Sequence, residues 1–202
     1  MKRINWLTLT VAAAVIANAQ SAAGQPAIPL TTLPSTVPVD VSQAIKRLYS
    51  PLPGQRIAAI IQLGGLGEKA APAVPFLLAL WDDAEPATMK TTMPGGVTLE
   101  STEYPRWQAV KAFGRIGKPA VAPLVAALVN ENEMIRRIAA QGLGAIKDPR
   151  AIEPLIAAAQ STGNDGGDAR ESLHRITGQD LATAAEWTKW WDENKAKYKK
   201  IG

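Results

Sequence analysis

The sequence contains no cysteine and only one histidine, and these two shortages exclude several kinds of site at once. A chain without cysteine forms no disulfide, offers no thiolate nucleophile and cannot build a cysteine-ligated zinc site. One imidazole alone cannot supply the usual zinc ligand sets either. A serine triad through His174 stays open, although no Gly-x-Ser-x-Gly sequence accompanies it. His174 is more typical of a surface or packing residue, so we expect no catalytic residue, no metal and no cofactor.

Long apolar runs are missing from the chain except at its start. Lys2 and Arg3 precede an apolar segment that ends at Ile16, and residues 17–19 read Ala-Asn-Ala. This order predicts a Sec-type signal peptide over residues 1–19. Its roughly 13 apolar residues fall short of the ~20 that cross a bilayer, so a membrane anchor is the weaker interpretation. We therefore expect an exported protein, periplasmic or secreted, with no membrane span after cleavage.

The charge balance gives little support to a nucleic-acid partner. The whole chain has a net charge of +4, and removing Lys2 and Arg3 leaves 20 basic (22 − 2) against 18 acidic residues, a net +2. Nucleic-acid binding needs a clustered basic face, which the sequence does not show. The acidic, glycine-rich segment 164–168 lacks the spacing and closing glutamate of a calcium loop. The glycines of 64–67 lie at an expected helix end, which excludes a nucleotide loop.

The main positive feature of the chain is an internal repeat. Residues 106–128 recur thirty positions later as residues 136–158, so that Ala109 corresponds to Ala139 and Gly114 to Gly144. An earlier copy, residues 56–67, lies at an offset of 50, and a partial later copy spans 169–178. Self-similarity at a fixed period is typical of a solenoid. The chain therefore contains three clear repeats and a degenerate fourth.

The shared pattern, Arg-x-x-Ala-x-x-Leu/Phe-Gly-x-Ile/Leu-Gly followed by Ala-Val-x-Pro-Leu, resembles the short HEAT-like repeats first described in phycobilisome lyases. The resemblance covers about residues 41–178. It implies an all-α fold, a right-handed α-α superhelix of about three full repeats with N- and C-terminal capping helices. It also implies a non-enzymatic, monomeric scaffold that binds a protein or peptide on its concave helix face. With the predicted signal peptide, we expect this scaffold in the cell envelope. The alternative is a lyase-type enzyme or bilin-binding protein. Export argues against that alternative, because the family attaches bilins in the cytoplasm.

Apolar spacing within each repeat predicts two helices. In the third repeat, apolar residues at 135, 138, 139, 142, 143 and 146 form one face of a first helix, which Asn132 caps. Glycines at 67, 117 and 178 stand where the first helices should end. In the second half we expect a short turn at Asp148–Pro149 and a helix from about residue 153. Its buried positions are Val121, Leu124, Val125 and Leu128 in one repeat, and Ile152, Leu155 and Ile156 in the next.

The remaining segments flank or interrupt the repeat domain, which we place at residues 40–178. Residues 20–39 are rich in Pro, Ala, Ser and Thr and predict a linker without regular structure. Asp40, with Gln43 three residues later, predicts a capped helix over 41–49. Residues 179–202 predict a C-terminal capping helix with a basic tail. Each boundary follows from a change in composition or period.

The offset of 50 between the first two repeats leaves about 20 extra residues within an insert at 82–105. Alternation at 97–100 and the Gly95-Gly96 pair allow a small hairpin. Insertions in solenoids gather on one face, often the binding face, although a tolerated surface loop is the plainer alternative. The binding candidates in and beside this insert are Trp81, Met89, Met93, Tyr104, Arg106 and Trp107.

Two further sets of residues have a structural and a functional interpretation. Arg56, Arg106 and Arg136 begin equivalent helices and predict a structural ladder that satisfies carbonyls and carboxylates; the alternative is an anion-binding row. Trp187, Trp190 and Trp191 lie on one side of a helix that a Thr183–Glu186 capping box opens. Such a cluster is typical of a C-terminal cap that covers the end of the array. The alternative is an aromatic platform for a sugar or peptide.

Overall fold

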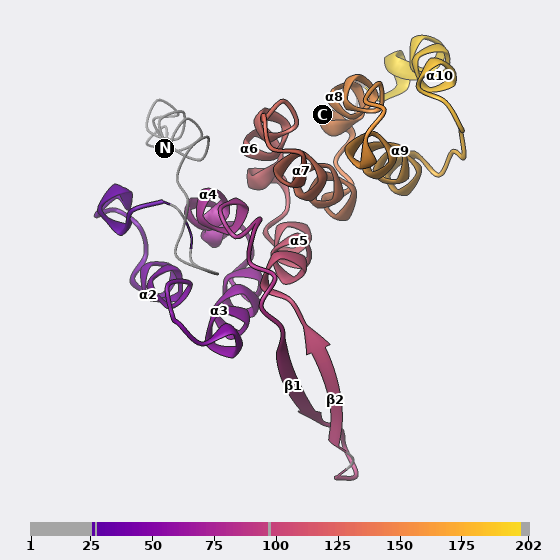
Figure 1. Ribbon diagram of the computed structural model, residues 1–202. Coiled ribbons are helices and arrows are strands. Elements are labelled where there is room, and N and C mark those ends of the chain that lie inside the picture. The colour runs from indigo at the N-terminus through magenta and orange to yellow at the C-terminus, as the bar shows by residue number, and fades with distance from the viewer. Residues whose placement is uncertain (1–25, 27, 97, 199–202) are drawn as a thin grey trace.

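The computed structural model describes residues 26, 28–96 and 98–198, and it is mainly helical with one short pair of strands (Figure 1). The α-helices are α2 (Val39–Arg47), α3 (Pro53–Gly65), α4 (Val74–Leu78), α5 (Pro105–Ile116), α6 (Val121–Ala127), α7 (Glu133–Ile146), α8 (Ile152–Ala158), α9 (Asn164–Thr177) and α10 (Ala184–Tyr198). The 3-10 helices are η1 (Leu30–Thr32), η2 (Gly67–Ala73), η3 (Lys118–Ala120) and η4 (Pro149–Ala151). The strands are β1 (Ala87–Thr92) and β2 (Thr98–Glu103). Within this described part, none of the helices combines the length and hydropathy that a membrane span requires.

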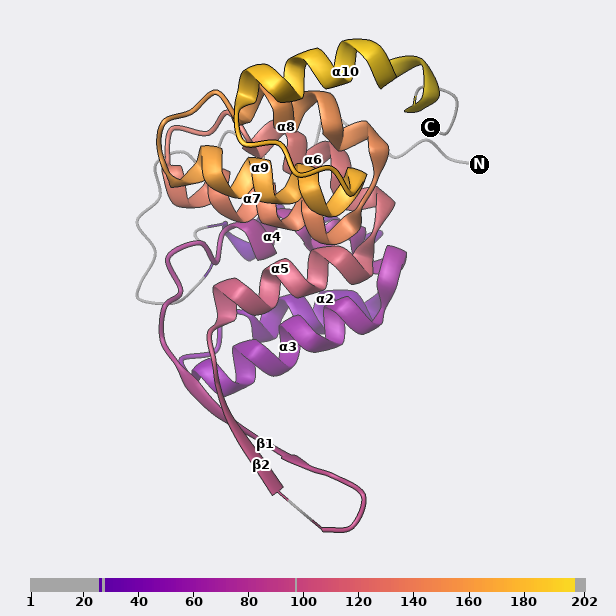
Figure 2. The same ribbon diagram turned by 90° about the vertical axis from the view of Figure 1, so that its right-hand side faces the viewer.

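The longer helices α3, α5, α7 and α9 lie side by side in chain order, and each packs against the next (Figure 2). The shorter α6 packs against α7, and α8 packs against α9. The predicted apolar positions of the third-repeat first helix are buried, as is Phe113, the equivalent of Leu143, except that Ile146 is half-buried. On the second helices the predicted positions are buried as well, and only Val125 is half-buried. The predicted helix pairs are therefore confirmed in their elements and in the face that each buries.

The first helices end where the glycines predict. Gly67, Gly117 and Gly178 have φ angles of 58°, 76° and 74°, which glycine adopts without the Cβ clash of other residues. Lys147 stands at the same place in the third repeat with φ 59°, and it is the one non-glycine residue with positive φ among those that the structure describes. The end of α7 is thus more strained than the equivalent end of α5.

Glycine also allows the first helices to approach closely. A Cβ atom placed on Gly144 of α7 would lie 2.6 Å from the hydroxyl oxygen of Ser172 on α9. Real Cβ atoms do not come this close, so the two helices meet at a spacing that only glycine permits. The recurring glycine of the repeat pattern therefore serves helix packing at this junction.

The predicted caps and turns of the third repeat are confirmed. The Asn132 side-chain oxygen accepts hydrogen bonds from the backbone of Met134 at 2.8 Å and Ile135 at 3.4 Å. The Asp148 carboxylate accepts one from the backbone of Arg150 at 2.9 Å, and the short turn η4 then leads into α8 at Ile152. Proline at the start of the turn costs no helical hydrogen bond.

The prediction of an N-terminal capping box at Asp40 and Gln43 is wrong. Helix α2 begins at Val39, directly after Pro38, so Asp40 lies inside the first turn. Its carboxylate accepts a hydrogen bond from the backbone of Val41 at 2.9 Å, the neighbouring residue, instead of capping the helix. A proline immediately before the helix fixes the chain direction and moves the start two residues earlier than the predicted 41.

The linker prediction for residues 20–39 also needs correction over the part that the structure describes. Ile28 is only 1% exposed, and its carbonyl accepts a hydrogen bond from the Tyr49 hydroxyl. Burial raises the pKa of Tyr49 to about 12. Leu30, Leu33 and Val37 pack against the core as well. This segment covers apolar surface at the open end of the helical stack. Residues 20–25 and 27 and the predicted signal peptide lie outside the described residues.

The composition of residues 161–167 is typical of a connector, but the connector is shorter than this segment, because α9 already begins at Asn164. Gly166 lies in its first turn, where a Cβ atom would clash with the carbonyl oxygen of Ser161. Asp165 is buried there, and its carboxylate accepts a hydrogen bond from the Arg136 side chain. Gly166 is therefore explained by the close approach of Ser161 to the first turn of α9, and not by a turn at Gly166 itself.

Candidate functional site

The insert forms an antiparallel hairpin that extends away from the helices (Figures 1 and 2). Its strands pair without interruption from Ala87 opposite Glu103 to Thr92 opposite Thr98. The predicted hairpin is confirmed, and its strands are longer than the alternation at 97–100 indicates. Strand β1 packs against α3 at the base, where Ala87 lies 4.0 Å from the position that a Cβ on Gly54 would take.

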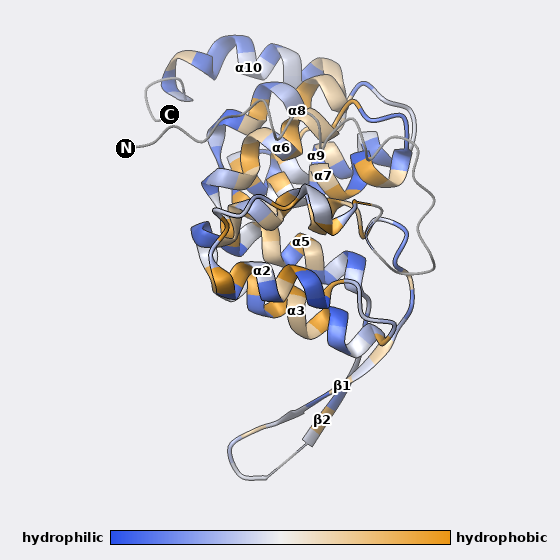
Figure 3. Ribbon diagram, turned by 90° about the vertical axis from the view of Figure 1, so that its left-hand side faces the viewer, coloured by the Kyte–Doolittle hydropathy of each residue, from blue (hydrophilic) through white to orange (hydrophobic). Residues whose placement is uncertain are grey.

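Beyond its base, the hairpin is exposed on both faces, and Figure 3 shows that its residues are mostly polar or of intermediate hydropathy. On one face Lys90 and Glu100 lie directly opposite and form an ion pair at 2.7 Å. The other face has Met89 on β1 and Leu99 on β2, and Leu99 is 54% exposed. A hairpin with so little buried surface depends on its anchors for a fixed position.

The first anchor is a buried arginine on α3. The Arg56 guanidinium is fully buried and donates to both oxygens of Asp83, at 2.6 and 2.9 Å. It also donates to Glu85 at 2.6 Å and to the Ser50 carbonyl at 2.9 Å. Burial raises the pKa of Asp83, and the hydrogen bonds from Arg56 oppose that rise. Because Asp83 and Glu85 lie just before β1, Arg56 fixes the start of the hairpin to the first repeat.

The second anchor holds the end of β2 to α5. Gln108 donates from its side-chain amide to the Glu103 carboxylate at 2.5 Å, and the Lys111 ammonium lies 3.5 Å from the same oxygen. The backbone N–H of Arg106 donates to the Asp83 carbonyl at 3.4 Å, which joins the two ends of the insert. Both strands are therefore tied to neighbouring first helices, and the arm leaves the stack in one direction.

The three equivalent arginines fall into two arrangements. Arg136 repeats the geometry of Arg56: it donates to Asp165 at 2.7 Å and to the carbonyl of Asn130, six residues earlier, at 2.8 Å. Burial opposes ionisation of Asp165, but the hydrogen bonds from Arg136 and Ser161 and the Arg136 charge together outweigh it, so the pKa of Asp165 is lowered. Arg106 differs, because its buried Nε has no hydrogen-bond partner among the described residues. Its guanidinium carbon lies 5.1 Å from the centroid of the Trp107 ring instead.

The six binding candidates do not converge on one point. Tyr104, Arg106 and Trp107 lie at the start of α5, and Trp81 lies close to Asp83 in sequence, so these four belong to the base of the hairpin. Trp81 and Trp107 pack against the core and are half-buried. Met89 lies along β1, and Met93 lies at the turn, where it is 46% exposed. The structure thus separates the candidates into a base group and an arm group.

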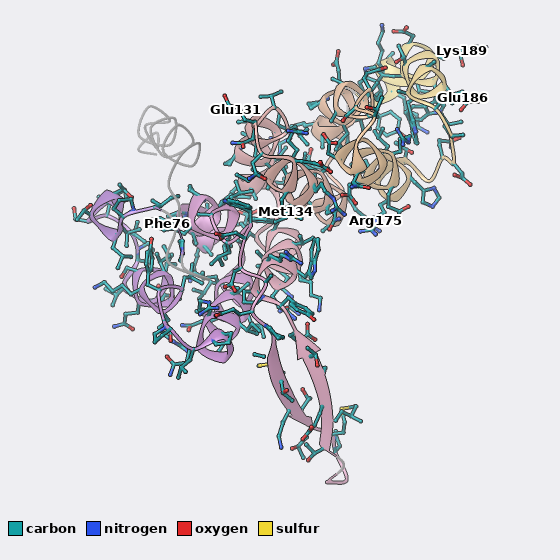
Figure 4. The ribbon with its side chains drawn as sticks, viewed as in Figure 1. Phe76, Glu131, Met134, Arg175, Glu186 and Lys189 are labelled. Carbon is teal, nitrogen blue, oxygen red and sulfur yellow. The ribbon has the colours of Figure 1, made fainter. Side chains whose placement is uncertain are left out.

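The tryptophan cluster lies on α10, at the far end of the stack. Trp187 is fully buried and Trp191 nearly so, while Trp190 is half-buried, 5.7 Å from Trp187 and 6.4 Å from Trp191 between ring centroids. Helix α10 packs against α8, and Thr183 and Glu186 form the reciprocal hydrogen bonds of the predicted capping box. Figure 4 shows Glu186 and Lys189 at the outer side of this helix. Little indole surface is left for a ligand platform.

His174, the one residue that kept a serine triad open, lies on the exposed side of α9. Its Nδ1 donates to the backbone carbonyl of Gln179 at 2.8 Å, so the ring helps to close the helix end. In the described part of the chain, no three histidine or acidic side chains gather in a group that could hold a metal ion. The candidate binding site is therefore the hairpin with its base.

Comparison with known proteins bears on the helical stack. Residues 99–173, from β2 to α9, match the HEAT repeats family. Together with the mainly helical structure, this match supports a HEAT-repeat protein. No curated protein matches the chain. HEAT repeats commonly mediate protein–protein interactions and usually act without enzymatic activity.

Two residues that matter for the site were missed from the sequence. Asp83 and Glu85 fix the hairpin through Arg56. The repeat carried a signal for one of them, because Glu85 follows Arg56 by 29 positions, as Asp165 follows Arg136. A usable signal was present in the acidic character of the insert. It holds Asp82, Asp83, Glu85, Glu100 and Glu103 against one basic residue, Lys90.

Proposed function

We propose that this chain is a non-enzymatic protein–protein interaction scaffold of the cell envelope. Its helix pairs form a right-handed superhelix of about three full repeats, and the hairpin of the insert is its binding arm. The observation that supports this most is the contrast at the base of the hairpin: Arg56 and Asp83 are fully buried, whereas the strands that they position are exposed. Binding residues often lie on exposed segments that a rigid scaffold positions in this way.

The concave helix face is the second surface of the proposal, because solenoids bind extended partners there. The predicted signal peptide supports export, and N-terminal sequencing of secreted protein tests it: the mature chain should begin near Gln20, and an intact Met1 would contradict export. The lyase-type alternative rests on the repeat resemblance alone, and fold analogy is weak support for an activity.

The test is affinity capture from an envelope extract with three forms of the chain. The first is the full chain. In the second, Asn-Gly replaces residues 88–102, which joins Ala87 to Glu103 by a two-residue turn and leaves Asp83, Glu85 and Glu103 in place. The third is a helix-face control, Ala122→Glu with Ala126→Glu, at two exposed positions of α6.

Loss of the partner in the hairpin form alone would assign binding to the hairpin, and loss in the α6 form alone would assign it to the helices. A full chain that captures no protein partner would contradict the scaffold function.

A further inference from the structure

We infer that the outer edge of β2 is a docking site for an extended, positively charged segment of a partner protein, which adds to the hairpin as a third strand. This inference rests on the proposed function, since it specifies how the hairpin would bind. The argument uses the open edge, its regular pairing and its charge.

The edge of β2 is open over more of its length than the edge of β1. Strand β1 packs against α3 at its base, whereas every residue of β2 except Glu103 is exposed. In an antiparallel pair, each strand directs half of its backbone N–H and C=O groups away from its partner. Along β2 these outward groups face solvent, and an incoming strand can bond to them without displacing a helix.

Strand β2 also lacks the features with which proteins usually block an edge. Proline, a β-bulge or an edge lysine normally interrupts or repels an incoming strand. The six pairs from Ala87–Glu103 to Thr92–Thr98 continue without a bulge, and β2 contains neither proline nor lysine. Two-stranded sheets are marginal in water, so a third strand adds stability that the hairpin lacks by itself.

Charge selects the occupant. On the paired strands 87–103 the charged residues are Lys90 on β1 and Glu100 and Glu103 on β2, a net charge of −1, and both acidic residues lie on β2. On β2 the Glu100 side chain is 56% exposed even though Lys90 lies opposite it on β1. A residue on an added strand would face Glu100 from the other side at a similar spacing. A cation fits there, and an apolar residue fits opposite the exposed Leu99.

A second copy of the chain suits this edge less well. Pairing β2 with β2 of another copy would bring together two strands that each carry Glu100 and Glu103. Like charges across neighbouring strands are destabilising. Strand addition is an established mode of peptide recognition in which backbone hydrogen bonds supply affinity and side chains supply selectivity. The acidic edge therefore favours a basic peptide segment over self-association.

The probe is the blocked peptide Lys-Thr-Val-Lys-Val-Thr, which in antiparallel register places a lysine opposite Glu100 and a valine opposite Leu99. In a titration of the full chain followed by amide NMR, we expect the β2 amides to shift and the β1 amides to change little. The matched variant is Lys90→Glu with Glu100→Lys. It keeps an opposite-charge pair inside the hairpin and reverses the charge at the edge, so we expect binding to weaken by about fivefold.

Two alternately N-methylated peptides separate strand addition from simple charge attraction. Methyl groups on one set of alternate amides face β2 and should abolish binding, whereas methyl groups on the other set face solvent and should be tolerated. The inference is overturned if the probe shifts no β2 amide or if both methylated peptides bind equally. Concentration-dependent dimers that protect the β2 amides would also overturn it.

The scaffold function is tested separately by the capture experiment. If the probe fails while the chain still captures a partner, strand addition falls and the scaffold function stands. If the probe binds but the full chain captures nothing, the edge is a peptide site and the scaffold function falls.

Discussion

The helical stack and the hairpin are stabilised in different ways. In the stack, residues such as Ile138 and Leu143 recur with the repeat and are fully buried. In the hairpin, the cross-strand Lys90–Glu100 pair is exposed, and the fixed position depends on Arg56 at the base. The hairpin is therefore held to the stack at its two anchors, and beyond them it is mostly exposed. Each prediction below tests one side of that division.

The largest effect is expected at the buried anchor. Arg56→Met leaves the Asp83 carboxylate buried without its partner, which should lower the free energy of unfolding by about 3–5 kcal/mol. The equivalent change Arg136→Met should lower it by about 1–2 kcal/mol, because charged hydrogen bonds contribute modestly and the Arg136 side chain is 25% exposed. Urea unfolding followed by circular dichroism measures both.

The control for the anchor is the double variant Arg56→Met with Asp83→Leu, which removes both charges and should recover much of the loss. Equal losses for Arg56→Met and Arg136→Met would contradict a special anchor beneath the hairpin.

A second test lies inside the stack. Gly144→Ala places a Cβ atom against Ser172, and the forced separation of α7 and α9 should cost about 1–3 kcal/mol. Gly65→Ala is the matched control, since nothing lies within 4 Å of a Cβ there. In that position alanine should be neutral or slightly stabilising. If the two variants unfold alike by thermal melting, close packing of the first helices does not explain the recurring glycine.

Helix ends allow a stabilising prediction. Lys147→Gly replaces a left-handed lysine by the residue that stands at the equivalent places 67 and 117, and it should raise the free energy of unfolding by about 1 kcal/mol. Gly117→Ala should act in the opposite direction. A chemical denaturation series of the two variants checks the signs, and a destabilised Lys147→Gly would show that the lysine side chain stabilises the fold.

The Asp148–Arg150 ion pair should make a smaller contribution to stability, and this contribution should depend on pH. Hydrogen bonds from the Arg150 guanidinium lower the pKa of Asp148, which burial alone would raise. A lowered carboxylate pKa stabilises the fold above the ordinary aspartate value of about 4, and this stabilisation is lost as the pH falls through the lowered value. Arg150→Met should therefore cost below about 1 kcal/mol at pH 7, because the arginine is half exposed.

The same variant should cost less at an acidic pH below the lowered pKa of Asp148 than at pH 7. Urea unfolding at both pH values and constant ionic strength tests this, and a difference that grows in acid would contradict the assignment.

The elements that recur with the thirty-residue repeat could be predicted from the sequence. Apolar positions recur every thirty residues, so the buried faces of α6, α7 and α8 could be located from a single chain. The cap at Asn132 was predictable because it depends on one residue and its immediate backbone neighbours. Contacts that the repeat does not encode were harder to find. Asp83 lies within the break of the period, and its partnership with Arg56 joins residues 27 positions apart.

Strand β1 and residues 28–37 were also hard to predict from the sequence. Strand β1, Ala-Thr-Met-Lys-Thr-Thr, alternates only at Ala87 and Met89, which are half-buried, and its other residues are exposed, so its apolar pattern is too short to predict a strand. Residues 28–37 have no periodicity, since they cover the stack by isolated contacts such as that of Ile28. Composition therefore indicated a linker where tertiary packing places a covering segment.

The smallest stability change should accompany the largest change in shape. Replacing residues 88–102 with Asn-Gly removes most of the hairpin but keeps Arg56, Asp83 and Glu103 in place. The deleted strands bury little, and an exposed ion pair such as Lys90–Glu100 contributes less than about 1 kcal/mol, so the free energy of unfolding should change by no more than that. Denaturant unfolding of this form beside the full chain measures the difference. A loss of several kcal/mol would mean that the arm belongs to the cooperative core. An unchanged stability with loss of partner binding would separate the arm from the stack in both energy and role.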